Sequence, residues 1–139
     1  MKRLVLDTNI LVHAGRSRRG ASNRLLRLAD ERAFAMLVSV PLFLEYEAVL
    51  LRPEQLLETG QSPEMAHGFL NYLAGIIEPV RLHYLWRPQL ADIADEMVLE
   101  TAINGNAEAI VTFNGRHFAP AHRFGIDVIV PSEALRRIG

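Results

Sequence analysis

The sequence predicts a three-layer α/β/α domain with a mostly parallel sheet, and two patterns lead to this fold class. Short, continuously apolar segments alternate with longer segments whose apolar residues recur at helical spacing. Strands that are apolar along their whole length are typical of parallel sheets covered by helices on both faces. Because the chain has 139 residues, 50% of them hydrophobic, we expect residues 1–139 to form a single domain.

Each expected element has a local signal. The expected strands are short apolar runs at 2–6, 33–39, 79–85, 109–112 and 127–130. A helix is expected to start at Thr8 and Asn9, and further helices lie at 21–32, 42–51, 63 to about 77, 93–104 and from 131 onward. Pro41 suits a first helical turn, Ser62 an N-cap and Gly105 a helix C-terminus. Asp7 and the segment 112–114 then follow strand ends, where open parallel sheets bind ligands.

Composition excludes several classes of function. A formal net charge of −1 gives no reason to expect a particular partner from charge alone. Without cysteine the chain has no disulfide, thiolate nucleophile or zinc-thiolate site. The longest apolar stretch, 33–44, is broken by Ser39 and Pro41 and is far shorter than the ~20 residues of a membrane span. We expect a cytoplasmic protein with no signal peptide and no membrane association.

Two acidic residues interrupt apolar segments in the first third of the chain. Asp7 ends the first expected strand within the run LVLDTNILV, and a buried, unpaired carboxylate costs several kcal/mol. Glu45 interrupts the apolar face of the helix expected at 42–51. Glu47 competes for the same role, and a partly exposed Glu45 is an equal alternative.

A third inward acid is expected on the helix at 93–104. Asp95 shares a face with apolar residues three, four and seven positions away, whereas Glu96 and Glu100 are expected to point elsewhere. Asp92 is expected to cap the helix. Asp7, Glu45 and Asp95 would repel one another without a cation, and hard cations such as Mg²⁺ or Mn²⁺ prefer carboxylate oxygens. The pattern therefore indicates a divalent metal site that could hydrolyse a phosphodiester.

Four segments in this order resemble the PIN-domain ribonucleases, especially the VapC-like toxins of bacterial type II toxin-antitoxin systems. They are LVLDTNILV, SVPLFLEYEAVLL, ADIADEMVLETAINGNAEAIVTFNGRHF and IDVIVPSEAL. The resemblance implies a Mg²⁺- or Mn²⁺-dependent endoribonuclease with a five-stranded sheet in the order 3-2-1-4-5. It also implies an RNA substrate, a cognate antitoxin and a homodimer.

Carried over residue by residue, the resemblance implies roles for individual side chains. Its three metal-binding acids fall on Asp7, Glu45 and Asp95. The supporting polar residues of the family fall on Thr8, Asn9 and Thr112. The fourth catalytic position, often Asp in the family, is Asn114 here, and this neutral side chain leaves open whether one metal or two are bound.

Basic residues follow the first and last of these segments. Arg16, Arg18 and Arg19 come after the first, while Arg116 and His117 come after the last. Each group could contact an RNA backbone, although loop arginines are often only solvated. Phe118, next to His117, is expected to anchor its loop in the core.

Two other functions remain open. A haloacid-dehalogenase-like phosphatase also begins with a strand ending in Asp, but it needs a second Asp where this chain has Asn9. A PIN-like module that binds RNA or protein without cutting is the main alternative, and Asn114 favours it. Dinucleotide binding is disfavoured because no glycine-rich turn follows the first strand.

Overall fold

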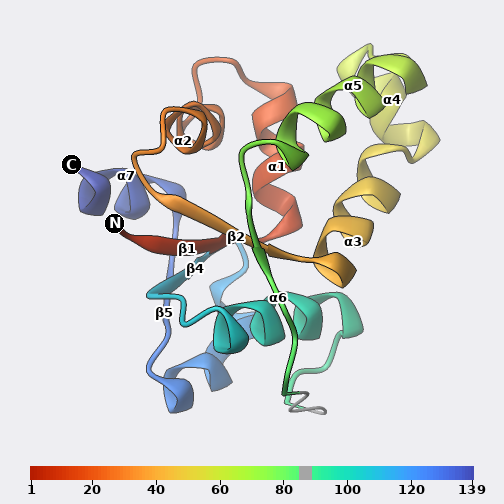
Figure 1. Cartoon of the computed structure of the whole chain (residues 1–139). Helices are drawn as coiled ribbons and strands as arrows, with labels where there is room; N and C mark the ends of the chain where they lie inside the picture. The colour runs from red at the N-terminus through yellow and green to blue at the C-terminus, as the bar shows by residue number, and fades with distance from the viewer. Residues whose placement is uncertain (85–88) are drawn as a thin grey trace.

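The computed structural model describes residues 1–84 and 89–139 and confirms the α/β architecture. Its five strands form an all-parallel sheet in the order β3-β2-β1-β4-β5, as expected. In Figure 1, α1 and α2 lie on one side of the sheet and α6 on the other. The strands are β1 (Arg3–Leu6), β2 (Ala35–Ser39), β3 (Glu78–Val80), β4 (Ala109–Val111) and β5 (Asp127–Ile129). The helices on the two sides of the sheet (Figure 1) are α1 (Thr8–Arg16) and α2 (Ala21–Asp30) on one side and α6 (Ile93–Asn104) on the other.

The strands form where the sequence is continuously apolar. Every residue of β2 and β4 is buried, because helices cover both faces of the sheet. The third strand is shorter than expected, since β3 ends at Val80 instead of 85. Position 85 itself lies outside the described residues.

The remaining helices are α3 (Val40–Leu50), α4 (Pro53–Thr59), α5 (Pro63–Ala74), the 3₁₀ segment η1 (Gly115–Phe124) and α7 (Pro131–Ile138). The Ser62 hydroxyl caps α5 by accepting from the amide of Met65 at 3.2 Å, as expected. Two elements were not predicted. Pro53 was interpreted as a helix stop, but it occupies the first turn of α4. η1 was not predicted, because Pro120 lies inside it and a proline argues against a continuous helix.

The core lies on both sides of the central strands. Phe34, Tyr46 and Phe118 are among its largest fully buried side chains. Phe118 has no exposed surface, which confirms that it anchors the segment after β4. Among the residues described, no helix is long and apolar enough to cross a membrane.

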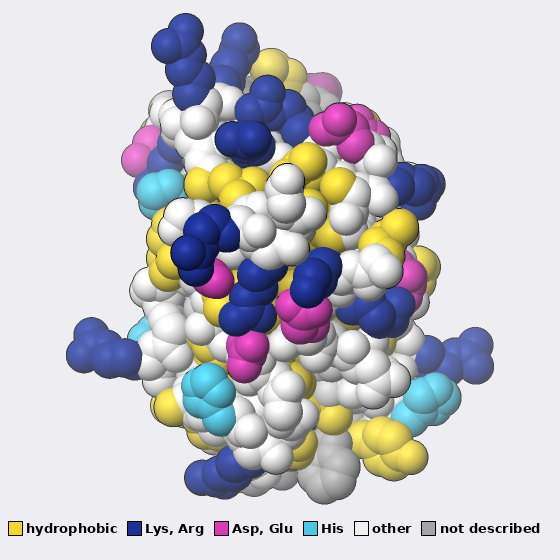
Figure 2. Space-filling model, turned by 90° about the vertical axis from the view of Figure 1, so that its left-hand side faces the viewer, with side chains coloured by type: hydrophobic (Ala, Val, Ile, Leu, Met, Phe, Trp, Pro, Cys, Tyr) yellow, Lys and Arg dark blue, Asp and Glu magenta, His cyan; other side chains and the backbone are white. Residues whose placement is uncertain are grey.

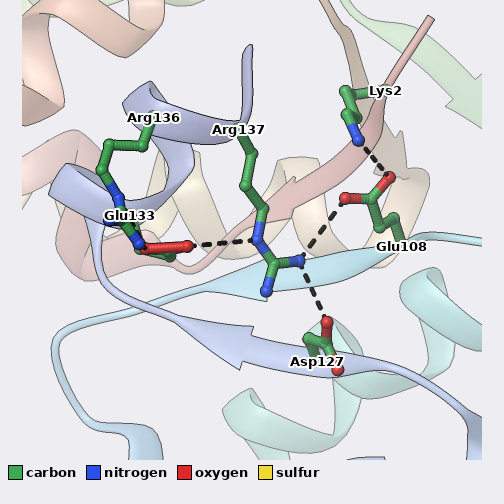
Figure 3. Close-up of polar contacts among 6 residues, drawn as sticks. All are labelled: Lys2, Glu108, Asp127, Glu133, Arg136 and Arg137. Carbon is green, nitrogen blue, oxygen red and sulfur yellow. Dashed lines mark hydrogen bonds and ion pairs between the residues drawn. The ribbon is translucent and has the colours of Figure 1, made fainter. Parts of the chain in front are cut away.

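The C-terminal helix is tied to the sheet edge by ion pairs (Figure 3). Arg137 of α7 contacts Asp127 of β5 at 3.0 Å, Glu108 at 3.4 Å and Glu133 of its own helix at 3.5 Å. These charges raise the pKa of Arg137.

The face in Figure 2 mixes Lys and Arg with Asp and Glu, so no purely basic surface forms there.

Gly105, directly after α6, lies where no side chain fits. A Cβ atom at this position would lie 2.9 Å from the Thr101 carbonyl oxygen and 3.0 Å from side-chain atoms of Leu37 and Val80. The Gly105 carbonyl also accepts two hydrogen bonds from the Arg3 guanidinium, at 3.0 and 2.8 Å. The close approach therefore fixes α6 against β2 and β3.

We expect Gly105→Ala to lower the free energy of unfolding by about 1–3 kcal/mol, because the added methyl group overpacks this contact. Urea denaturation measures the loss. Gly68→Ala in α5 is the matched control, since no described atom lies within 4 Å of its Cβ position, and it should be neutral or slightly stabilising. Equal stability of the two variants would contradict the packing argument.

Candidate metal-dependent active site

Asp7 lies at the centre of the candidate site, where β1 ends and α1 begins. Its side chain is buried, and one carboxylate oxygen, Oδ1, accepts from the amide of Thr8 at 2.7 Å. The other, Oδ2, accepts from the Thr112 hydroxyl at 2.7 Å. Thr112 directly follows β4, which pairs with β1 in the sheet. The sheet thus brings together two residues that lie 105 positions apart in the sequence.

The Thr112 hydroxyl organises the polar residues around Asp7. Its oxygen accepts from the amide of Asn114 at 2.9 Å and from the side-chain nitrogen of Asn9 at 3.4 Å. The Asn9 side-chain oxygen is buried and has no hydrogen-bond partner within the described parts of the chain. The structure therefore places Thr8, Asn9 and Thr112 around Asp7. The Asn9 side-chain oxygen can face a cation there or the water bound to it.

Asp95 lies in the first turn of α6 and is electrostatically linked to Asp7. Its side chain is 14% exposed, and the ring nitrogen Nδ1 of His117 lies 3.3 Å from its carboxylate. Burial, together with the negative charges of Asp7 and Asp92, raises the pKa of Asp95 to about 6. Burial likewise raises the pKa of Asp7, although hydrogen bonds from Thr112 and Thr8 oppose the shift. Both carboxylates are thus poorly stabilised as anions.

Asp92 caps α6, as expected, because its carboxylate accepts from the amide of Ala94 at 2.8 Å. Its charge also acts on both Asp7 and Asp95. The exposed Asp92 carboxylate therefore adds negative potential beside the pair without being part of its hydrogen-bond network.

Glu45 is not brought into this network. It is half-buried in the middle of α3 and has no hydrogen bond or ion pair to another described residue. The next residue, Tyr46, is the one that reaches the core, where its hydroxyl donates to the carbonyl oxygen of Leu6. Glu47 is half-buried too. Among residues 1–84 and 89–139, no three acidic or histidine side chains lie close enough to enclose a metal ion.

The orientation expected for the other acids of α6 is wrong. Glu96 and Glu100 are 3% and 1% exposed and more buried than Asp95. One Glu96 oxygen, Oε1, accepts from the amides of Gln89 and Leu90 and so holds the segment that precedes the helix. α6 is buried on more than one side, so its apolar stripe does not mark its only buried face. The four-residue spacing of Glu96 and Glu100 places both on one face of the helix, and this was the sequence signal that could have indicated a second buried face.

The segment after β4 forms one wall of a cavity of about 850 Å³ beside Asp95. Arg116 and His117 line this cavity, together with Asp92 and Leu90 from the opposite wall. The Asn114 side chain is exposed, and the Asn114 backbone carbonyl oxygen accepts from the amide of His117 at 3.0 Å. Arg116 and His117 thus lie beside the acids, as their predicted contact with RNA requires.

The basic residues at the end of α1 and directly after it lie elsewhere. Arg16 contacts Glu58 at 2.8 Å and the Gln55 side-chain oxygen at 3.3 Å, at the far end of α1 from Asp7. Arg18 lines the same 380 Å³ cavity between α1, α4 and α5, and Arg19 is exposed nearby. The structure does not bring these three arginines to the acids, and their contact with RNA stays a prediction.

The donor set suits a hard divalent cation in part. The buried carboxylate of Asp7 and the partly buried one of Asp95 both have raised pKa values, and the Asn9 amide oxygen beside Asp7 has no hydrogen-bond partner among the described residues. Mg²⁺ commonly uses one or two protein carboxylates and fills its other positions with water or substrate phosphate. Asp7 and Asp95 could therefore serve as the protein ligands of one such ion, with Glu45 outside the set.

Comparisons with known proteins agree with this architecture. A chain from the structure of VapBC2 from Rickettsia felis, bound to a DNA fragment from its promoter, superposes with a TM-score of 0.62 at 17% identity. The match covers 91% of this chain and 98% of that one. A chain from VapBC-1 of nontypeable Haemophilus influenzae gives 0.65 at 14% identity, with 94% and 98% covered. These identities show a shared fold alone, and no curated protein sequence matches the chain.

A family model described as the PIN domain matches residues 3–116. The match includes Asp7, Glu45, Asp95, Thr112 and Asn114, the positions on which the site was predicted. It covers most of the chain and begins within the first strand. The chain therefore belongs to the PIN-domain family.

Proposed function

We propose that this chain is a metal-dependent endoribonuclease and the VapC-like toxin of a toxin-antitoxin pair. The observation that supports it best is the pair formed by Asp7 and Asp95 in a PIN-domain chain. Both carboxylates have raised pKa values near the carboxyl ends of the strands, and no lysine or arginine of the described residues is among the groups that shift them. A divalent cation would compensate this charge.

Asp7 and Asp95 would hold Mg²⁺ or Mn²⁺, which supplies charge neutralisation at the scissile phosphate and activation of water. Asp7 is prepared for this role, because Thr8 and Thr112 each fix one of its oxygens. A ligand held from both sides binds with little loss of side-chain entropy. Asp95 is oriented by His117.

Arg116 and His117 would bind the RNA backbone beside the acids. Both line the 850 Å³ cavity that Asp95 and Asp92 also border. A phosphodiester is negatively charged, so it needs cations on its other side when the acids face it across a metal. Asp95 of α6 thus faces the basic side chains Arg116 and His117 of η1, and an RNA backbone placed between α6 and η1 would contact both.

A PIN-like module that binds RNA or protein without cutting is the second candidate. Two features favour it, namely Glu45, which lies outside the network, and Asn114, which contributes no charge. If Glu45 does act as a ligand, α3 has to bring it closer on binding metal or substrate. One metal held by two acids is the minimum that activity requires under our proposal.

The proposal includes an antitoxin partner, a homodimer and a cytoplasmic location. The two solved structures described above are both of VapBC complexes, which supports a partner of this class. Several large apolar side chains of α3, α4 and α5 are exposed, which suits a protein contact. They are Val40, Leu44, Leu57, Met65 and Tyr72.

RNA cleavage tests the proposed function. The wild type should cut single-stranded RNA in Mg²⁺ or Mn²⁺ and not in EDTA, whereas Asp95→Asn should lose at least about 100-fold in rate. Glu54→Gln is the matched control, because Glu54 is an exposed acid on α4. Glu45→Gln tests whether the third predicted acid contributes. Binding of RNA without any product in either metal would favour the non-cutting module.

A further inference from the structure

Two aromatic rings lie together on the surface beside the acids. Phe113 is 42% exposed, although it directly follows the buried Thr112. Its ring centroid is 4.4 Å from that of His13, and the two planes are inclined by 37°. His13 is exposed as well. The pair thus presents aromatic surface to solvent.

The position of the pair follows from contacts already described. His13 lies four residues after Asn9 on α1, so both side chains occupy the same face of the helix. Asn9 contacts the Thr112 hydroxyl, which in turn holds Asp7. Phe113 is the residue directly after Thr112. The rings therefore lie next to the carboxylate on the side of α1, while the cavity with Arg116 and His117 lies on the side of α6.

The backbone around Phe113 is fixed on both sides. The amide of Asn114 donates to the Thr112 side chain at 2.9 Å, and the amide of His117 donates to the Asn114 carbonyl at 3.0 Å. Single exposed apolar side chains are common on protein surfaces. An exposed phenyl ring that is held beside the acids and packed on a second ring is suited to binding another flat group.

We propose that Phe113 and His13 form a stacking platform for one unpaired RNA base next to the phosphate that is cut. The inference rests on the proposed function and adds the form of the substrate. Bases in a duplex are stacked on their neighbours, so only a single strand, loop or bulge can place a base on the rings. Stacking uses the face of the base, so the platform tolerates every base.

RNA oligonucleotides with one abasic position, moved step by step across the cleavage site, test the platform. Base stacking on an aromatic side chain is worth a factor of about 5- to 100-fold. We expect wild-type kcat/KM to fall by this factor for one abasic position. Phe113→Leu, which keeps an apolar side chain without a π face, should lose as much on intact RNA and nothing further on that abasic RNA. Phe113→Tyr should retain activity.

Equal sensitivity of the wild type and Phe113→Leu to every abasic position would overturn the platform while leaving RNA cleavage established. Fluorescence anisotropy of labelled single-stranded RNA in EDTA separates the two proposals. If no RNA is cut but binding weakens 5-fold or more in Phe113→Leu, the platform stands and the nuclease proposal fails. If Phe113→Leu cuts RNA at the wild-type rate and binds it with the wild-type affinity, the platform fails.

Discussion

Asp7→Asn is expected to abolish RNA cleavage and, in metal-free buffer, to make the folded chain more stable. The loss of activity should be at least about 100-fold, because a neutral amide holds a divalent cation far less well than a carboxylate. The gain in stability follows from burial, which raises the pKa of Asp7 in the folded state. Function and stability thus impose opposite requirements on one side chain.

The sign of the stability effect depends on pH. A carboxyl group with a raised pKa binds its proton more tightly in the folded state than in the unfolded state. Its neutral form stabilises the fold at low pH, and this contribution is lost as the pH rises through the folded-state pKa. At pH 8 the ionised Asp7 therefore lowers stability, and Asn at this position removes the cost.

Thermal unfolding in EDTA at several pH values measures this difference. The melting temperature of Asp7→Asn should exceed that of the wild type at pH 8, and the gap should narrow as the pH falls toward 4. Mg²⁺ should raise the wild-type value, because binding to the folded state adds stability, and should leave the variant almost unchanged. Glu54→Gln should follow the wild type throughout. A variant less stable than the wild type at pH 8 would contradict the assigned cost of the buried charge.

Phe118→Ala is expected to be the most destabilising single change in the segment after β4. The side chain has no exposed surface, and truncation of a buried phenylalanine costs about 3–5 kcal/mol. The same change loosens the segment that carries Arg116 and His117, so cleavage should fall as well. Urea denaturation measures the first effect and kcat/KM the second.

His122→Ala is the control for Phe118→Ala. His122 is exposed within the same 3₁₀ segment, so its truncation should change the free energy of unfolding by less than about 0.5 kcal/mol. A loss below about 1 kcal/mol for Phe118→Ala would show that the segment does not depend on this anchor.

The central part of the site follows from local patterns combined with one rule about parallel sheets. Asp7 and Thr112 each end a short apolar strand, and the rule that strand ends share one edge predicts that they converge. The Thr112 hydroxyl indeed contacts Asp7. Asp92 as a cap and Phe118 as an anchor follow equally from local signals, and both are confirmed.

Other features depend on tertiary contacts that a local pattern does not contain. Glu96 is buried because it binds the segment before α6, a contact that no periodicity reveals, and Glu100 is buried as well. Glu45 has the same apolar neighbours as an inward acid, yet the turn of α3 directs Tyr46 to the core instead. Whether Glu45 binds metal stays a prediction. A proline can follow the end of one helix or begin the next, so Pro53 alone did not predict that α4 starts there.

The contact between Thr112 and Asp7 has a consequence for how the protein is made. Asp7 and Thr112 are separated by 105 residues, so the ribosome adds Asp7 to the chain long before it adds Thr112. Until β4 docks beside β1, Asp7 lacks the hydroxyl that orients it, and the pair with Asp95 is not assembled. Under the proposed function, the metal site is therefore incomplete until the last third of the chain has been synthesised and has docked on the first strand.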